Sequence, residues 1–266
     1  MPASIVKSKL KSGRPVLVNK SNFHNPSMVE LIGLMGFDCL WLCNEHIAVD
    51  QSLMASMLQA CRASGMDCVV RVGQDCYADI MRFLELGANG LMLPHITDAA
   101  SLEKVIDVAK FPPLGHRGID AVSADADFGM MPLADYLKFA NEQTFIVAQI
   151  EDVTGLNNIE EIAAVKGVDV IFIGPADLSL NMGIPGQLKH PDIIDAIKRA
   201  VKVCRNNNIT CGTPGLDPDH SKMLLDMGVG YITGASDYGI LVRGFREARE
   251  KYRAIGFDFR DEGRKY

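Results

Sequence analysis

Apolar and polar positions along the chain form two alternating kinds of segment. Short, nearly continuous apolar runs recur eight times, and stretches with apolar residues at helical spacing separate most of them. Continuous apolar runs are typical of parallel strands that are buried on both faces. The predicted strands are residues 15–19, 37–43, 68–72, 90–94, 145–150, 168–173, 210–213 and 231–233.

The intervening segments have the spacing of amphipathic helices. Glycine, asparagine or proline follows most of them, as is usual where a helix ends. The predicted helices are residues 27–32, 48–63, 79–86, 99–109, 159–165, 192–205 and 221–227. This alternation predicts an α/β fold, a closed (β/α)8 TIM barrel. An open doubly wound sheet is the alternative, but no Gly-x-Gly-x-x-Gly motif follows the first strand.

Two segments exceed what a minimal barrel needs. Residues 95–144 are too many for a single helix, and an insertion of this length suits a lid or a subunit contact. Residues 239–252 have the pattern of a C-terminal helix longer than barrel closure requires. Because no linker or low-complexity stretch interrupts the chain, we expect one barrel domain over residues 1–266.

Composition narrows the class of protein. The length of 266 residues is that of a single barrel, and the 48% hydrophobic content is enough for a large core. The net charge of −6, without any basic stripe, argues against a nucleic-acid partner. No apolar run reaches the roughly 18 residues of a membrane span. Seven scattered cysteines without a CxxC pair indicate reduced thiols, and the N-terminus lacks an apolar signal region, so we expect a cytoplasmic protein.

Two acidic residues follow consecutive predicted strands. Glu151 comes after the fifth strand and Asp177 after the sixth. In a barrel, active sites are built at this carboxyl end of the strands. Two carboxylates, with the Gln149 amide beside them, are hard oxygen ligands suited to Mg²⁺ or Mn²⁺. For each acid alone, a helix N-cap is the alternative.

The ends of the second and third strands add a histidine and an arginine. Arg71 follows a run of valines, where an unpaired charge would be costly. It is predicted either to form a structural ion pair or to act as a fixed cation facing a substrate oxyanion. His46 is a candidate for proton transfer, and a solvated loop histidine is its alternative.

A series of motifs then carries a family resemblance. Taken together and in order, the motifs resemble the HpcH/HpaI family of class II pyruvate aldolases over roughly residues 15–250. That family belongs to the wider phosphoenolpyruvate/pyruvate group of barrels. The motifs are Asn44-Glu45-His46, Val70-Arg71-Val72, Leu86-Gly87-Ala88-Asn89-Gly90, Pro112-Pro113-Leu114-Gly115-His116-Arg117-Gly118, Gln149-Ile150-Glu151 and Gly174-Pro175-Ala176-Asp177-Leu178.

The resemblance implies an activity and a role for each site residue. The activity would be reversible cleavage of a 4-hydroxy-2-oxo acid to pyruvate and an aldehyde through a stabilised enolate. A divalent ion, Mg²⁺ or Mn²⁺ with Co²⁺ as a further option, would be held by Glu151 and Asp177. The backbone N–H groups of Ala176 and Asp177 would bind the pyruvate carboxylate, while Gln149 and Arg71 would face the keto oxygen.

The resemblance also implies an oligomer, a hexamer built as a trimer of dimers. His46 would work with an acid from a neighbouring subunit, and Glu85 occupies the position where the family usually has aspartate. The family commonly has an acid three residues before the histidine, where this chain has Cys43. This departure bears on the aldehyde pocket more than on the enolate chemistry.

Other functions remain open at this point. One is a carbon–carbon lyase of the citrate-lyase β or malyl-CoA type, although no basic patch for a nucleotide is found. Another is a barrel that binds ligands without catalysis. A Schiff-base aldolase would need a lysine at a strand end. Only Lys20 is so placed, and its polar neighbours Asn19, Ser21 and Asn22 predict little desolvation of the amine.

Overall fold

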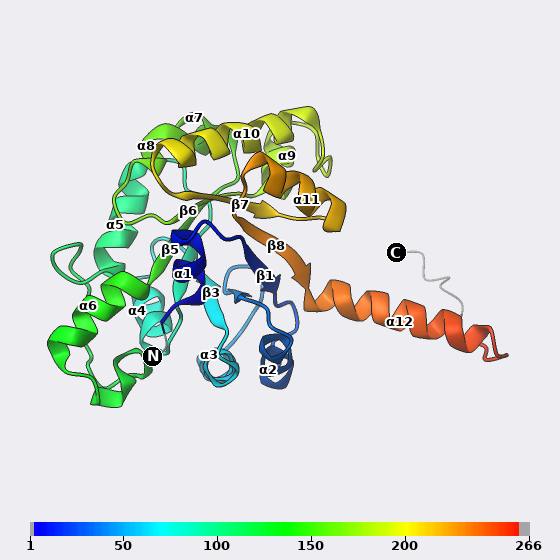
Figure 1. Ribbon diagram of the computed structural model, residues 1–266, viewed down its shortest axis with the longest axis horizontal. Coiled ribbons are helices and arrows are strands. Elements are labelled where there is room, and N and C mark those ends of the chain that lie inside the picture. The colour runs from blue at the N-terminus through cyan, green and yellow to red at the C-terminus, as the bar shows by residue number, and fades with distance from the viewer. Residues whose placement is uncertain (1–2, 261–266) are drawn as a thin grey trace.

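Eight parallel strands close into a barrel in the order of the chain, as the sequence predicts (Figure 1). The computed structural model describes residues 3–260. Each strand pairs with the next, and the first pairs with the last. The strands are β1 Val16–Lys20, β2 Cys39–Cys43, β3 Asp67–Arg71, β4 Gly90–Leu93, β5 Phe145–Ile150, β6 Val170–Ile173, β7 Thr210–Pro214 and β8 Tyr231–Ser236.

Barrel closure changes the two strands at the seam. The apolar pattern predicts that the last strand ends at Thr233, but β8 continues to Ser236 and β1 to Lys20. The reason is the pairing between them, in which Asn19 lies opposite Ala235 and Lys20 opposite Ser236. Hydrogen bonding across the seam thus extends both strands into polar sequence.

The seven predicted helices are all present. They are α2 Pro26–Leu34, α3 Gln51–Ser64, α4 Tyr77–Glu85, α5 Ala99–Ala109, α8 Ile159–Ala163, α10 Pro191–Asn206 and α11 Pro218–Met227. The structure has further helical elements outside the seven predicted ranges, namely α1 Ile5–Lys11, the 3₁₀ helix η1 Ala124–Gly129, α6 Leu133–Gln143, α7 Val153–Asn157 and α9 Pro175–Asn181. None of the helices in residues 3–260 has the length and apolar character needed to cross a membrane.

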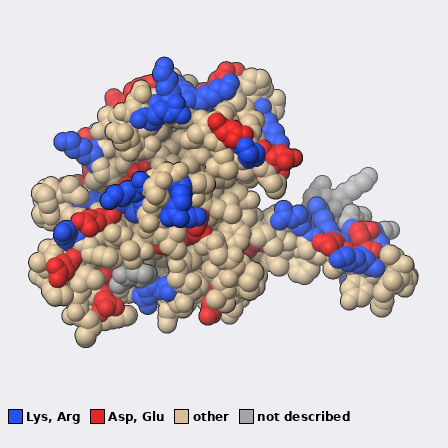
Figure 2. Space-filling model, viewed as in Figure 1, with Lys and Arg blue, Asp and Glu red and all other residues tan. Residues whose placement is uncertain are grey.

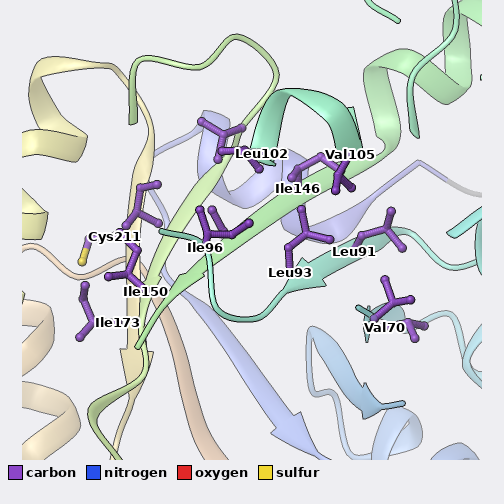
Figure 3. Packing of buried hydrophobic residues seen from close by; sticks show 14 of the residues in the cluster. Val70, Leu91, Leu93, Ile96, Leu102, Val105, Ile146, Ile150, Ile173 and Cys211 are labelled. Carbon is purple, nitrogen blue, oxygen red and sulfur yellow. The ribbon is translucent and has the colours of Figure 1, made fainter. Parts of the chain in front are cut away.

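The apolar core has two layers. The larger layer lies between the sheet and the helices, and Figure 3 shows part of it, with Leu91 and Leu93 of β4 and Ile146 of β5 gathered beside Val105 of α5. The second layer fills the barrel itself with side chains such as Phe172. Val6 of α1 belongs to this inner layer, so α1 closes the end of the barrel opposite the carboxyl ends of the strands.

The long segment 95–144 packs on the outside of the barrel. After α5 it forms η1 and α6, which have a small core of their own around Phe111 and Tyr136. A buried ion pair with an N–O distance of 2.7 Å joins Arg117 to Asp125, which also accepts a hydrogen bond from the Tyr136 hydroxyl. Gly118 lies beside Tyr77 of α4, so the segment runs along that helix.

The C-terminal helix does not complete the wall of its own barrel. Helix α12, Asp237–Arg253, extends away from the barrel as an arm (Figure 1), and Asp237 is its only buried residue. The outer face of the β1–β8 seam is therefore uncovered, and Leu17 of β1 is 44% exposed there. Figure 2 shows basic and acidic side chains interspersed over the face in view.

Candidate active site

Glu151 is buried at the carboxyl end of β5. Its side chain is 2% exposed, and its Oε1 accepts a hydrogen bond from Gln149 Nε2. Gln149 is equally buried, and its own carbonyl oxygen Oε1 has no hydrogen-bond partner. A buried acceptor without a partner is costly in a folded protein, so this oxygen is available to a ligand.

The next strand leaves room for this carboxylate. A Cβ atom on Gly174, directly after β6, would lie 2.7 Å from Glu151 Oε1 and 3.1 Å from Gln149 Nε2. Any side chain at this position would therefore push into the pair. Glycine allows the carboxylate to sit at the point where the two strand ends meet.

Asp177 lies in the first turn of α9, directly after β6. Burial raises the pKa of Glu151 to about 7, and the nearby negative charge of Asp177 adds to this effect, while His95 and Arg71 oppose it. Two carboxylates in this relation favour a cation between them. Within residues 3–260, however, no three or more histidine, cysteine, aspartate or glutamate side chains come together as a complete metal site.

Arg71 ends β3 and is 4% exposed. Its Nε lies 3.0 Å from Glu45 Oε2 in an ion pair, and its Nη2 donates to Cys43 Sγ at 3.0 Å. The guanidinium also lies 5.0 Å from the ring centroid of Trp41. These contacts fix the plane of the guanidinium, and the structural ion pair predicted as one alternative is present.

Cys43 takes the place of an acid at this strand end. Its thiol is buried, which opposes ionisation, but hydrogen bonds from the His46 backbone N–H and from Arg71 outweigh burial. The pKa of Cys43 therefore lies below its usual value. The position keeps a hydrogen-bond acceptor for Arg71 and, when the thiol is ionised, a negative charge.

Glu45 and His95 connect Arg71 to Glu151, a link that the sequence pattern did not predict. His95 Nε2 lies 3.1 Å from Glu45 Oε1, and its Nδ1 lies 3.4 Å from Glu151 Oε2. The backbone N–H of His95 donates to the same Glu151 oxygen at 3.2 Å. His95 has a positive φ of 53°, which aims both groups at Glu151. Its position just after β4 was a signal that could have been followed.

Comparison with known proteins identifies the family. The family model described as HpcH/HpaI aldolase/citrate lyase matches residues 21–258. The chain belongs to this family. The resemblance seen in the sequence is thereby confirmed.

Individual relatives support an aldolase. A hydroxypyruvate/pyruvate aldolase of Pseudomonas aeruginosa is 33% identical over 95% of this chain and 94% of its own length. A 5-keto-4-deoxy-D-glucarate aldolase of Klebsiella pneumoniae is 32% identical over 85% of this chain and 86% of its own. The crystal structure of an HpcH/HpaI aldolase from Desulfitobacterium hafniense superimposes with a TM-score of 0.90 at 28% identity, covering 97% of this chain and all of that one.

Not every residue implied by the HpcH/HpaI resemblance comes together in one chain. His46 is exposed, and its Nε2 lies 3.9 Å from Glu45 Oε2. Glu85 is at the end of α4, where it lines a cavity with Arg62 and Phe128. Burial and the nearby Asp125 and Asp120 raise the pKa of Glu85, while Arg117 lowers it.

The prediction for Lys20 is wrong. Its neighbours in sequence suggested little desolvation, but Lys20 is half-buried, and its ammonium group lies 5.0 Å from the Trp41 ring. Burial, and after it the charge of Arg71, lowers the pKa of Lys20. Barrel closure brings β1 beside β2, so residues distant in sequence set this environment. The strand β1 ends in Lys20 itself, one residue beyond the predicted strand end.

Proposed function

We propose that this protein is a metal-dependent class II aldolase. It reversibly cleaves a 4-hydroxy-2-oxo acid to pyruvate and an aldehyde through an enolate of pyruvate. The observation that supports this most is the junction of Glu151, Asp177 and the unpartnered Gln149 oxygen with the oriented Arg71. Arg71, together with a cation held by the two carboxylates, would stabilise the negative charge that forms when a proton leaves the pyruvate methyl group.

The residues present fit a divalent ion of the Mg²⁺ or Mn²⁺ class. Glu151 and Asp177 would hold it, because hard oxygen ligands suit these ions and Mg²⁺ typically takes only one or two carboxylates plus substrate and water oxygens. Burial raises the pKa of Glu151, and a bound cation would favour its ionised form. When bound, the ion would supply Lewis acidity that lowers the energy of the enolate.

The chain's own groups would orient pyruvate. The cap residue Gly174 offers no side chain to the first N–H groups of α9. The backbone N–H groups of Ala176 and Asp177 are therefore free to bind the carboxylate of pyruvate. Gln149 and Arg71 would face the keto oxygen, and Arg71 would stabilise the negative charge that develops there.

Proton transfer would use residues from two subunits. His46 has the chemistry of a general base, and its exposed position at the barrel mouth leaves it open to a neighbouring chain. Glu85 would come from that neighbour to orient it. Burial raises the pKa of Glu85.

Chelation should stop the reaction. We expect EDTA to abolish retro-aldol turnover, measured as pyruvate release coupled to lactate dehydrogenase, and Mg²⁺, Mn²⁺ or Co²⁺ to restore it. In a Schiff-base aldolase an enamine would instead form on a lysine, and Lys20 has the lowered pKa that this chemistry needs. Borohydride added with pyruvate should nevertheless leave the chain without a covalent adduct, as judged by intact-protein mass spectrometry.

Two results would contradict the metal mechanism. One is turnover that is indifferent to the chelator. The other is a reduced pyruvyl group on Lys20, located by peptide mapping. A Lys20→Met variant tests the lysine mechanism directly. If Lys20 formed a Schiff base, this variant would lose both the covalent adduct and all turnover.

We also propose that the protein assembles through α12. One side of this arm carries exposed apolar residues, among them Tyr238, Phe245 and Tyr252, and no helix of the same chain covers the outer face of the β1–β8 seam in residues 3–260. Exposed apolar surface of this kind is usually buried by a partner. If two copies exchanged their α12 helices, the arm of each copy would cover the β1–β8 seam of the other and bury its own apolar side there. Such an exchange fits the hexamer that the family resemblance implies.

Phe245→Asp should therefore weaken the assembly. We expect wild type to sediment as an oligomer and the variant as a smaller species with reduced aldolase activity, because a charge cannot be buried cheaply in an apolar contact. Lys251→Gln on the same helix changes only an exposed pair with Glu247 and serves as the control. A wild-type monomer with full activity would refute the shared site.

A further inference from the structure

A cavity of about 300 Å³ lies on the side of the barrel mouth opposite to β5, and the proposed chemistry does not use it. The ends of β1 and β8, the loop after β7 and the start of α12 enclose it. Its lining includes Lys20, Leu216, Thr233, Ser236, Ile240 and Arg243. A volume of this size suits a small ligand or one end of a larger one.

The charged groups of this cavity are both cationic. Lys20 and Arg243 line it, and no acidic side chain does. Asp237, the nearest acid in sequence, does not line the cavity, and its buried carboxylate accepts hydrogen bonds from the backbone N–H groups of Asn22 and Phe23, although its charge still reaches Lys20. In the described part of the chain, neither Lys20 nor Arg243 forms an ion pair with a carboxylate.

The cavity also holds a polar group that lacks a partner. Thr233 is 8% exposed, and its hydroxyl oxygen is buried without a hydrogen bond. Thr233 lies two residues after Tyr231 and therefore on the same face of β8. Because the Tyr231 side chain fills the barrel interior, the Thr233 side chain points into the mouth. Ser236 Oγ accepts from the Gly239 N–H, which leaves its own O–H free to donate. Both hydroxyls can thus bind an oxyanion.

The position of the cavity agrees with general barrel architecture. Barrels often bind phosphate at the loops after the seventh and eighth strands, beside the start of an extra helix. Lys20 also ties the cavity to the reacting groups, because its ammonium and the Arg71 guanidinium each lie 5.0 Å from the Trp41 ring centroid. A substrate held near Arg71 could therefore extend to Lys20.

We propose that this cavity is a subsite for a terminal oxyanion of the substrate. The aldehyde released by the aldolase then carries a negatively charged group, a carboxylate or a phosphate, at the end remote from its carbonyl. Lys20 and Arg243 supply the charge, and the hydroxyls of Thr233 and Ser236 donate hydrogen bonds. This inference rests on the proposed aldolase function and adds the class of its aldehyde.

The test compares aldehydes that differ in terminal charge. Aldol addition to pyruvate is followed with two matched pairs, succinic semialdehyde against butanal and glyceraldehyde 3-phosphate against glyceraldehyde. We expect wild type to favour the charged member of at least one pair, and that pair identifies the anion as carboxylate or phosphate. In Lys20→Met and Arg243→Gln, kcat/KM for the charged aldehyde should fall by at least about tenfold, as expected when a charge-assisted hydrogen bond is lost. The neutral aldehyde should change by much less.

Direct binding gives a readout that does not depend on turnover. Calorimetric titration of the full chain with inorganic phosphate and with succinate should show binding that both variants lose. Arg246→Gln, on the same helix but outside the cavity lining, is the matched control and should bind as wild type does. Circular dichroism confirms that each variant is folded.

The outcomes separate the subsite from the aldolase proposal. Exchange of the pyruvate methyl protons in D₂O, followed by NMR for wild type, reports enolate chemistry without any aldehyde. If exchange occurs but the variants affect charged and neutral aldehydes equally, the subsite is refuted and the aldolase stands. If exchange is absent while both variants lose anion binding, the subsite stands and the aldolase does not.

Discussion

Replacing Glu151 by glutamine should abolish metal-dependent turnover while the barrel stays folded. An amide of the same shape can accept only one of the two hydrogen bonds that Glu151 accepts from Gln149 and from the His95 backbone, and it cannot supply the negative charge that a divalent ion needs. The measurement is pyruvate release at increasing Mg²⁺ or Mn²⁺, together with calorimetric titration of each ion into the protein. Loss of both binding and turnover is expected.

Glu161→Gln is the control for Glu151→Gln, because it changes an exposed acid on α8 and should behave as wild type. Turnover by Glu151→Gln at saturating metal would refute the assignment of Glu151 as a ligand. Retained metal binding by the variant would show that the ion binds at another part of the barrel mouth.

The pKa of Glu151 adds a dependence on pH. Because the folded-state pKa is raised from 4.5 to about 7, ionisation of this carboxyl opposes folding of the metal-free protein. This free-energy cost of folding is absent below the unfolded-state pKa of 4.5, grows between pH 4.5 and about 7, and is complete above that range. It amounts to at most about 3 kcal/mol. Without metal above pH 7, Glu151→Gln should therefore melt no lower than wild type, and metal binding by wild type should weaken below pH 7.

Replacing Arg71 by lysine should be almost as damaging. The planar guanidinium meets Glu45 and Cys43 with different nitrogens and stacks near Trp41, and an ammonium group cannot reproduce this arrangement. If Arg71 stabilises the enolate oxygen as an oxyanion-hole donor does, its loss raises the barrier by about 2.7–4 kcal/mol, or about 10²–10³ in kcat. Steady-state kinetics of pyruvate release measures this effect.

The pattern of the loss identifies its cause. Removal of a transition-state contact lowers kcat, whereas removal of a binding contact alone raises KM. Arg199→Lys, at an exposed ion pair with Glu160 outside the barrel, is the matched control. Activity of Arg71→Lys within a few-fold of wild type would show that Arg71 serves only the structure.

The sequence by itself determined the barrel and the pair of acids. Each strand is a local apolar run and each helix a local amphipathic pattern, so both can be recognised without knowledge of their neighbours. Glu151 and Asp177 were found for the same reason. Parallel strands that are consecutive in a barrel must place their carboxyl ends side by side, so two acids just beyond them must approach each other.

Only the tertiary structure decided which side chains at neighbouring strand ends contact one another. Glu45 contacts both Arg71 at the end of β3 and His95 just after β4, and no spacing in the sequence shows that these three side chains turn toward each other. Lys20 is half-buried beside the Trp41 ring, so burial, and after it the charge of Arg71, lowers its pKa despite its polar neighbours in sequence. Likewise, α12 was expected from its pattern, but its departure from the barrel was not. A helix pattern states which face is apolar, whereas the surface that covers this face depends on the three-dimensional arrangement of the chain and its partners.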